Sequence, residues 1–177
     1  RLTSIIPNKG NPSYTEVCGK QHTIQRAISC IGVALHTGSK VYLTLHPAEQ
    51  NTGIIFRRTD LTGSNNIRAS WDNVVDTRLS TKIGNEQGNI VGTIEHLMAA
   101  LSGCGVDNAY IELDGPEVPV MDGSAQPFVS LIEEAGLFEQ DAAGKVIEIL
   151  KPVRVEIDDK LAELTPSNKF CVSCDID

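Results

Sequence analysis

One segment, residues 91–131, constrains the fold more than any other, because it contains a short helix with one clear polar side. The expected helix carries apolar residues at the i, i+3, i+4, i+7 spacing of a single face, namely Ile94, Leu97, Met98 and Leu101. Thr93 is the expected N-cap, and Gly103 and Gly105 are expected to end the helix. The apolar stripe would make the core contacts of the helix, which turns its other side away from them.

Glu95 and His96 share that other side, in the first turn. A neutral imidazole is a good zinc ligand, and a neighbouring carboxylate can take a proton from zinc-bound water. Zinc lowers the pKa of such water to about 7, which makes hydroxide available at neutral pH. The pair lacks the His-Glu-x-x-His spacing that puts two ligands one turn apart. Taken alone, the pair is better explained as a solvated helix start with an exposed histidine.

Around this segment, residues 21–140 predict one sheet and a second helix. Alternating or β-rich runs punctuated by Gly- and Asn-containing turns indicate strands within residues 22–35, 40–48, 53–60, 67–75, 76–92 and 108–113. A second helix is predicted over about Gln126–Ala135, with Gly136 as its stop. One sheet covered on one face by two helices is a complete α+β unit with two layers.

The residue composition and the sequence pattern change at both ends of this unit. Residues 1–20 are rich in Pro, Asn, Gly and Ser and predict a flexible tail. Residues 145–177 contain three strand-like runs whose order resembles that of the first strands: 146–157, 160–166 and 169–176. A three-stranded sheet with a bare apolar face is not expected to stand alone. The chain is therefore expected to stop inside a second, similar α+β domain.

The net charge limits the kinds of binding partner, and the cysteine content indicates the redox compartment. A formal net charge of −8 argues against wide contact with nucleic acid or anionic lipid, since both need a basic face. No apolar run is long enough to span a membrane. The five cysteines are odd in number and suggest no disulfide framework, which favours reduced thiols in a cytosolic compartment. Cys171 and Cys174 fall in a predicted strand and would point to opposite faces, which argues against a metal site there.

Several longer strings carry more information than the Glu-His pair. In chain order they are GVALHTG, LTLHPAEQNTGIIFRRTDL, VVDTRLST, TIEHLMAAL and GVDNAYIELDGPEVPVMDGSAQPF. Over residues 21–177 they resemble the UDP-3-O-acyl-N-acetylglucosamine deacetylases, the zinc enzymes of lipid A (lipopolysaccharide) biosynthesis. In that family two domains, each a sheet with two helices, pack their helical layers together as a β-α-α-β sandwich. The active site lies between them.

The resemblance implies a zinc-dependent amide hydrolase that removes acetate from the glucosamine nitrogen of a UDP-linked, 3-O-acylated sugar. It makes His96 a zinc ligand and Glu95 the base that activates water. The family's other two zinc ligands, in a His-Lys-x-x-x-Asp helix of the second domain, have no counterpart in these 177 residues. Catalytic zinc sites normally use three protein ligands. The remaining ligands of the Zn²⁺ are therefore expected beyond Asp177, and this chain alone is expected to be inactive.

The resemblance also implies four substrate-binding residues. Leu35 would touch the acyl chain, and His36 would line the site. Leu79 and Ser80 would border the substrate backbone. A tight turn with an exposed histidine explains His36 equally well, and ordinary strand packing explains Leu79.

Two further functions stay open at this stage. A truncated or degenerate homologue without activity would act as a binding or assembly module. A generic α+β domain would carry the Glu-His pair incidentally. By resemblance, the full-length protein would be a monomer in the bacterial cytoplasm, or in a plant organelle such as the mitochondrion. Any membrane contact would be peripheral, through the acylated substrate.

Overall fold

The computed structural model describes residues 19–63 and 65–175, so most of the predicted tail (residues 1–18) lies outside the described residues. The described residues form an α+β fold, which confirms the predicted fold class. Lys20, assigned to the tail from the sequence, begins strand β1 (Lys20–Ile24). The division into domains stays a prediction.

The main sheet has five strands in the order β2-β3-β9-β4-β5. They are β2 (Ile28–Val33), β3 (Lys40–Pro47), β9 (Ala109–Leu113), β4 (Ile54–Arg58) and β5 (Asn66–Arg68). Strand β9 is antiparallel to β3 and parallel to β4. In β3, β4 and β9 the more buried residues alternate with more exposed ones, so one face of the sheet forms the core.

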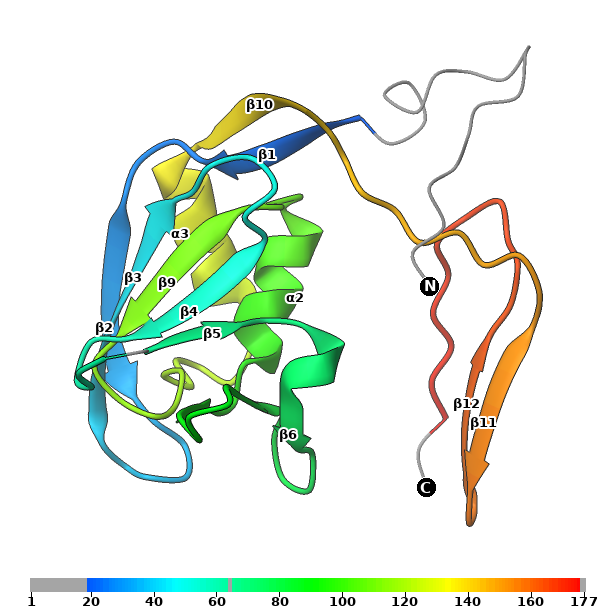
Figure 1. Ribbon diagram of the computed structural model, residues 1–177, viewed down its shortest axis with the longest axis horizontal. Coiled ribbons are helices and arrows are strands. Elements are labelled where there is room, and N and C mark those ends of the chain that lie inside the picture. Colours follow the sequence, from blue (N-terminus) through cyan, green and yellow to red (C-terminus); the bar gives the residue numbers. More distant parts are fainter. Residues whose placement is uncertain (1–18, 64, 176–177) are drawn as a thin grey trace.

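Helices α2 (Glu95–Gly103) and α3 (Gln126–Ala135) cover the core face of this sheet (Figure 1). Their buried residues are Leu97, Ala100, Leu101, Phe128, Ile132 and Ala135. The predicted apolar stripe and the predicted bounds of the second helix are both confirmed. Helix α3 ends before Gly136, whose φ of 74° is a conformation that glycine adopts without strain.

The predicted N-cap of α2 is wrong. The cap position falls at Ile94, and no side chain caps the first turn. Thr93 has a φ of 54°, and its hydroxyl donates a 2.8 Å hydrogen bond to Oε1 of Glu117. The hydroxyl therefore binds a residue that is distant in the sequence. Residue preferences at helix N-termini cannot predict such a contact.

Two smaller sheets complete the main body. Strands β6 (Val74–Asp76), β7 (Lys82–Gly84) and β8 (Ile90–Val91) form an antiparallel sheet after a 3-10 turn at Trp71–Asn73. Strand β1 pairs antiparallel with β10 (Leu137–Ala143). The sequence did not predict β10, because LFEQDAA lacks an alternating pattern and only its pairing with β1 makes it a strand.

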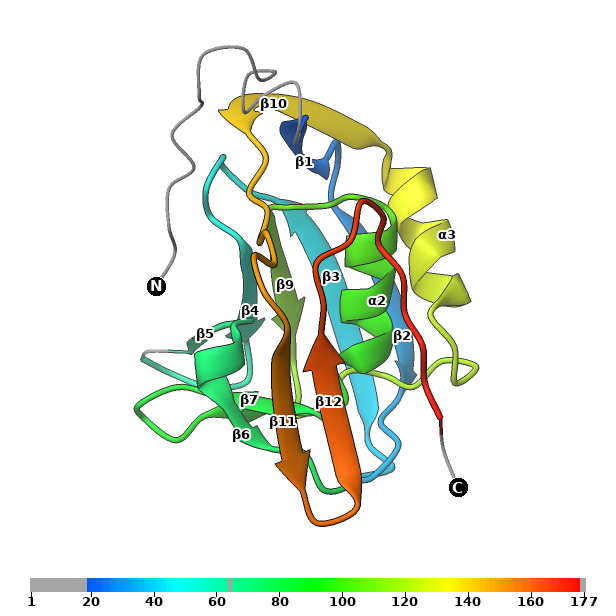
Figure 2. The ribbon, with the colours of Figure 1, turned by 90° about the vertical axis from the view of Figure 1, so that its right-hand side faces the viewer.

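A separate hairpin, β11 (Val153–Ile157) and β12 (Lys160–Leu164), stands away from the body on the helical side of the sheet (Figures 1 and 2). All of its residues are exposed. The third predicted strand, in residues 169–176, is wrong for the part that the structure describes, because no strand is assigned between residues 165 and 175. Whether this hairpin begins a second domain stays a prediction.

A buried polar network joins β1 and β10 to the main sheet. The Asn108 side chain is 1% exposed and donates hydrogen bonds to Gln21 Oε1 (2.9 Å) and Gln140 Oε1 (2.7 Å). Its own Oδ1 accepts a 2.8 Å bond from the backbone N–H of Gly53. Polar groups in an apolar interior are tolerated when they are paired in this way.

We therefore expect Asn108→Ala to lower the free energy of unfolding by about 3 kcal/mol, because it leaves the Gly53 N–H and the Gln140 carbonyl oxygen buried without this partner. Urea unfolding followed by circular dichroism measures the change. Asn66→Ala, at an exposed position of β5, is the control and should cost about 0.5 kcal/mol or less. Equal losses in the two variants would contradict a stabilising role for the network.

Candidate functional site

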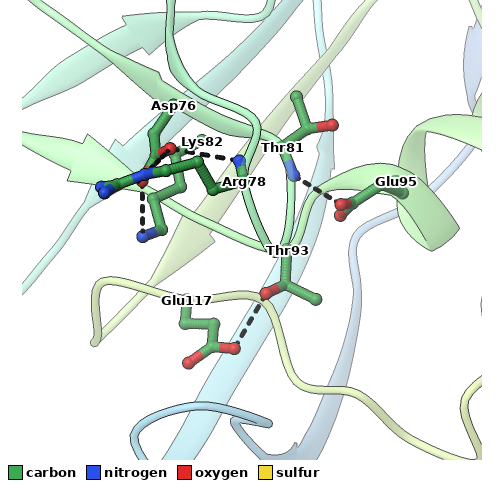
Figure 3. A network of polar contacts seen from close by, with 7 residues as sticks. All are labelled: Asp76, Arg78, Thr81, Lys82, Thr93, Glu95 and Glu117. Atoms are coloured by element: carbon green, nitrogen blue, oxygen red, sulfur yellow. Dashed lines mark hydrogen bonds and ion pairs between the residues drawn. The ribbon is translucent and has the colours of Figure 1, made fainter. Parts of the chain in front are cut away.

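The opening turn of α2 brings Glu95 and His96 together as predicted, and both are half-buried. Oε1 of Glu95 accepts a hydrogen bond from the backbone N–H of Thr81 (Figure 3). Oε2 is buried and has no hydrogen-bond partner among the described residues. A buried carboxylate oxygen without a partner is costly, so a water molecule or ligand is the natural occupant of the space it faces.

His96 has an acidic neighbour in the loop before α3. Asp122 accepts hydrogen bonds from the Ser124 hydroxyl (2.8 Å) and the Ser124 backbone N–H (2.9 Å). These bonds lower the pKa of Asp122, and the nearby His96 lowers it further. Asp122 therefore stays ionised, and its main geometric role is to form the turn that leads to α3.

The loop between β6 and β7 packs against Glu95. Ser80 is 7% exposed, and its Oγ, like Glu95 Oε2, is buried without a hydrogen-bond partner among the described residues. Leu79 next to it is 83% exposed. Ordinary strand packing therefore does not explain Leu79, and two neighbouring residues differ sharply, one pointing into the protein and one outward.

Asp76 holds this loop in shape (Figure 3). Its carboxylate accepts a 3.0 Å bond from Arg78 Nε and a 3.2 Å bond from Lys82 Nζ. Hydrogen bonds from the Arg78 side chain and backbone, together with Lys82, hold the pKa of Asp76 well below its usual 3.8. Thr81 lies between these two cations in sequence, so the cluster fixes the backbone N–H that binds Glu95.

The loop after β2 contains the other predicted substrate-binding residues. Leu35 is 58% exposed, and His36 is exposed as well. The backbone N–H groups of His36 and Thr37 donate to the carboxylate of Glu117, which also accepts the Thr93 hydroxyl. Sequence reasoning missed Glu117. Its only signal was an acidic residue between the turn Asp114-Gly115-Pro116 and the apolar run 118–120.

The structure thus connects two other predicted regions to the start of α2. The Ser80 region touches it through the Thr81–Glu95 bond, and the His36 loop reaches it through Glu117. Two surface hollows lie elsewhere, one lined by residues such as Asn51 and Arg68, the other by residues such as Ile31 and Tyr42. The roles predicted for these residues remain predictions.

The site offers few metal ligands of its own. Within residues 19–63 and 65–175, no three His, Cys, Asp or Glu side chains form a group that could hold a metal ion. His96 is therefore a single candidate ligand, with Glu95 beside it.

The fold and this turn define a class of protein, an α+β domain that presents a carboxylate and an imidazole at the start of a helix. Comparison with known proteins identifies the family within this class. Residues 21–177 match the family described as UDP-3-O-acyl N-acetylglycosamine deacetylase, and the chain belongs to this family. The predicted resemblance is confirmed.

Three relatives, each named UDP-3-O-acyl-N-acetylglucosamine deacetylase, illustrate the similarity. The protein of Idiomarina loihiensis is 55% identical over 158 residues, which are 89% of this chain and 52% of the relative. The protein of Acidithiobacillus ferrooxidans is 54% identical over 159 residues, again 89% and 52%. That of Shewanella frigidimarina is 52% identical over 157 residues, or 89% and 51%. The chain spans about half the length of these relatives.

None of the helices in the part of the chain that the structure describes combines the length and the apolar character needed to cross a membrane.

At neutral pH we expect Asp76→Asn to loosen the loop that carries Thr81, because a neutral amide holds Arg78 and Lys82 less strongly than a carboxylate does. Hydrogen exchange at the Thr81 amide measures this, and its protection factor should fall. Because the folded pKa of Asp76 is lowered, its contribution is present above the unfolded value of about 3.9 and is lost only as the pH falls through the lower folded value.

The difference between wild type and Asp76→Asn should therefore persist at pH 4.5. Asp72→Asn, exposed in the 3-10 turn, is the matched control and should leave Thr81 protected. If Thr81 remained equally protected in the Asp76 variant, the cluster would not be what fixes this loop.

Proposed function

We propose that the full-length protein hydrolyses the N-acetyl group of UDP-3-O-acyl-N-acetylglucosamine and releases acetate, a step of lipid A biosynthesis. The observation that carries the proposal is the buried, unpartnered Oε2 of Glu95 beside His96 in the first turn of α2. Membership of the family supports it, as do the names of relatives that are 52–55% identical. A free carboxylate oxygen at this place suits a general base.

The residues of the site fit one part of a zinc centre. His96 would supply an imidazole ligand, and the unpartnered Glu95 oxygen would face a water molecule rather than the metal. Bound zinc would supply Lewis-acid polarisation of the amide carbonyl and acidify a water molecule. The match covers only 52% of the length of the Idiomarina loihiensis relative, so we assign the remaining ligands to the rest of the full-length protein.

Glu95 is suited to moving a proton. Its Oε1 is held by the Thr81 N–H, so the carboxylate cannot rotate freely and Oε2 keeps one direction. In the proposed reaction Oε2 removes a proton from the attacking water, and the oxygen of that water bonds to the acetyl carbon. The carbon–nitrogen bond then breaks, and the leaving amine takes up a proton. A base held in place in this way contributes on the order of 10²- to 10⁴-fold in rate.

The substrate would lie across the exposed residues near this turn. Leu35 and Leu79 are 58% and 83% exposed, so Leu35 is free to contact the acyl chain and Leu79 to border the substrate backbone. His36 would line the site from the same loop as Leu35, and Ser80 Oγ has an unused hydrogen-bonding capacity toward the sugar. We assign the UDP-linked acylated amino sugar as the partner of these four residues.

The remaining assignments follow from the same proposal. Residues 145–177 would belong to a second α+β domain that packs on the helices of residues 21–140. The protein would work as a monomer in the bacterial cytoplasm, with membrane contact only through its acylated substrate. An inactive homologue that acts as a binding module is the competing function, because no three His, Cys, Asp or Glu side chains among the described residues form a group that could hold a metal ion.

Glu95→Gln in the full-length protein should lower kcat by about 10²-fold or more, because the amide cannot accept the proton. Acetate release from the acylated UDP-sugar is the measurement. Glu133→Gln, an exposed substitution on α3, is the control and should leave kcat unchanged. Wild-type protein that binds the sugar without releasing acetate would support the binding module and overturn the enzyme.

His96→Ala should reduce the zinc content of the full-length protein from about one equivalent to a small fraction, because a three-ligand site would lose a ligand. Metal analysis after dialysis measures the content independently of activity. His46→Ala is the matched control, since His46 bonds Glu112 on the other face of the sheet. If zinc stayed stoichiometric in the His96 variant, His96 would not be a ligand.

A further inference from the structure

Glu117 is a buried carboxylate that the proposed chemistry does not use. It lies in the connection between β9 and α3 and is 3% exposed. Burying a charged group is costly unless hydrogen bonds replace its water. The hydrogen-bond partners of Glu117 therefore show which parts of the protein this carboxylate holds together.

Those partners belong to two different parts of the site. On one side Glu117 accepts bonds from the backbone N–H of His36 (3.0 Å to Oε1) and of Thr37 (3.2 Å to Oε2). On the other side Oε1 accepts the Thr93 hydroxyl at 2.8 Å (Figure 3). One carboxylate thus ties the loop that carries Leu35 and His36 to the turn that leads into Glu95 and His96.

The backbone around Glu117 makes the same two connections. Val118 N–H donates to Gly92 O (3.0 Å), and Gly92 N–H donates to Pro116 O (2.9 Å). Toward the other side, Val120 N–H donates to the carbonyl of Val33 at 2.9 Å. Segment 116–120 is therefore fixed between the two regions, and its one buried carboxylate points at both.

Thr93 shows that the connection matters for the helix start. Its φ of 54° is unfavourable for a β-branched residue, and one residue separates it from Glu95. The bond to Glu117 fixes the Thr93 side chain while its backbone holds this conformation. The direction in which α2 begins, and with it the aim of Glu95 and His96, depends on this turn.

The carboxylate is ionised at neutral pH. Burial alone would raise the pKa of Glu117, but the hydrogen bonds from His36, Thr93 and Thr37 outweigh it, so the pKa lies below the usual 4.5. All its donors are therefore bound by a negative charge, and such hydrogen bonds are roughly twice as strong as neutral ones.

We propose that Glu117 is a positioning residue that sets the separation between the Leu35–His36 loop and the Glu95–His96 turn, and thereby couples recognition of the acyl chain to hydrolysis. This inference rests on the proposed deacetylase function. It assigns Glu117 no contact with substrate or metal. Its effect would pass through the backbone of His36 and through Thr93.

Glu117→Gln in the full-length protein tests the proposal. Glutamine keeps the shape, but it has one acceptor oxygen for three donors and places an NH₂ group against N–H donors. We expect the amides of His36 and Thr37 to lose protection from hydrogen exchange. We also expect kcat/KM for the 3-O-acylated sugar to fall by about 10²-fold, the size of effect that a misplacement of about 1 Å produces.

The ratio of kcat/KM for the acylated sugar to that for UDP-N-acetylglucosamine separates positioning from general stability. A positioning role lowers this ratio, because the Leu35 loop shifts relative to Glu95. A merely structural role would lower stability and leave the ratio unchanged, and that result would overturn the proposal. Glu133→Gln should change neither the ratio nor the protection of these amides.

A second pair of variants keeps the test decisive if Glu117→Gln does not fold. Thr93→Val removes the hydroxyl that binds Glu117, and Thr93→Ser keeps it. We expect the valine variant to lose the preference for the acylated sugar and the serine variant to keep it. Equal preferences in the two variants would overturn the inference.

Hydrogen exchange separates this inference from the proposed function. If the wild-type protein released no acetate, the proposed function would fail, and the coupling of catalysis to Glu117 would fail with it. Loss of His36 and Thr37 protection in Glu117→Gln would still establish the structural tie. If the wild type were active and those amides stayed protected in the variant, only the Glu117 inference would fail.

Discussion

The packing of α2 against the main sheet is the interaction on which the rest of the site depends. Leu97, Ala100 and Leu101 are almost fully buried, so the helix cannot rotate about its axis without exposing apolar surface. The direction of Glu95 and His96 in the first turn follows from this fixed rotation. Removing a buried leucine costs about 2–5 kcal/mol, which is large compared with any single polar contact at the turn.

Contacts from two other segments then adjust the orientation that helix packing gives to the first turn of α2. The Thr81 N–H binds one oxygen of Glu95, and Glu117 binds the Thr93 hydroxyl just before the helix. Both contacts join a carboxylate to donors far away in the sequence. The buried Oε2 of Glu95 remains without a partner among the described residues. Among the described residues only Ser80 Oγ shares this state, so these two buried atoms are the groups left for an outside molecule.

The sequence predicted elements whose signals are local and failed where a distant partner decides. Helix α3 and the apolar stripe of α2 were predicted because helical spacing and a terminal glycine are local features. Thr93 was misread as an N-cap, since its hydroxyl binds a residue 24 positions away. Strand β10 was missed because its pairing with β1, not its own pattern, makes it a strand. Glu117 escaped notice because nothing near it in sequence reveals its three donors.

The pairing of β1 with β10 has a consequence for the order in which the domain folds. Lys20 is aligned with Ala143, and the Gln21 side chain also bonds the carbonyl of Ala143, so β1 forms its antiparallel ladder only when β10 is present. Contacts between such distant residues slow folding, because a long loop must close before they form. During synthesis on the ribosome, β1 would therefore lack this ladder until residue 143 has emerged.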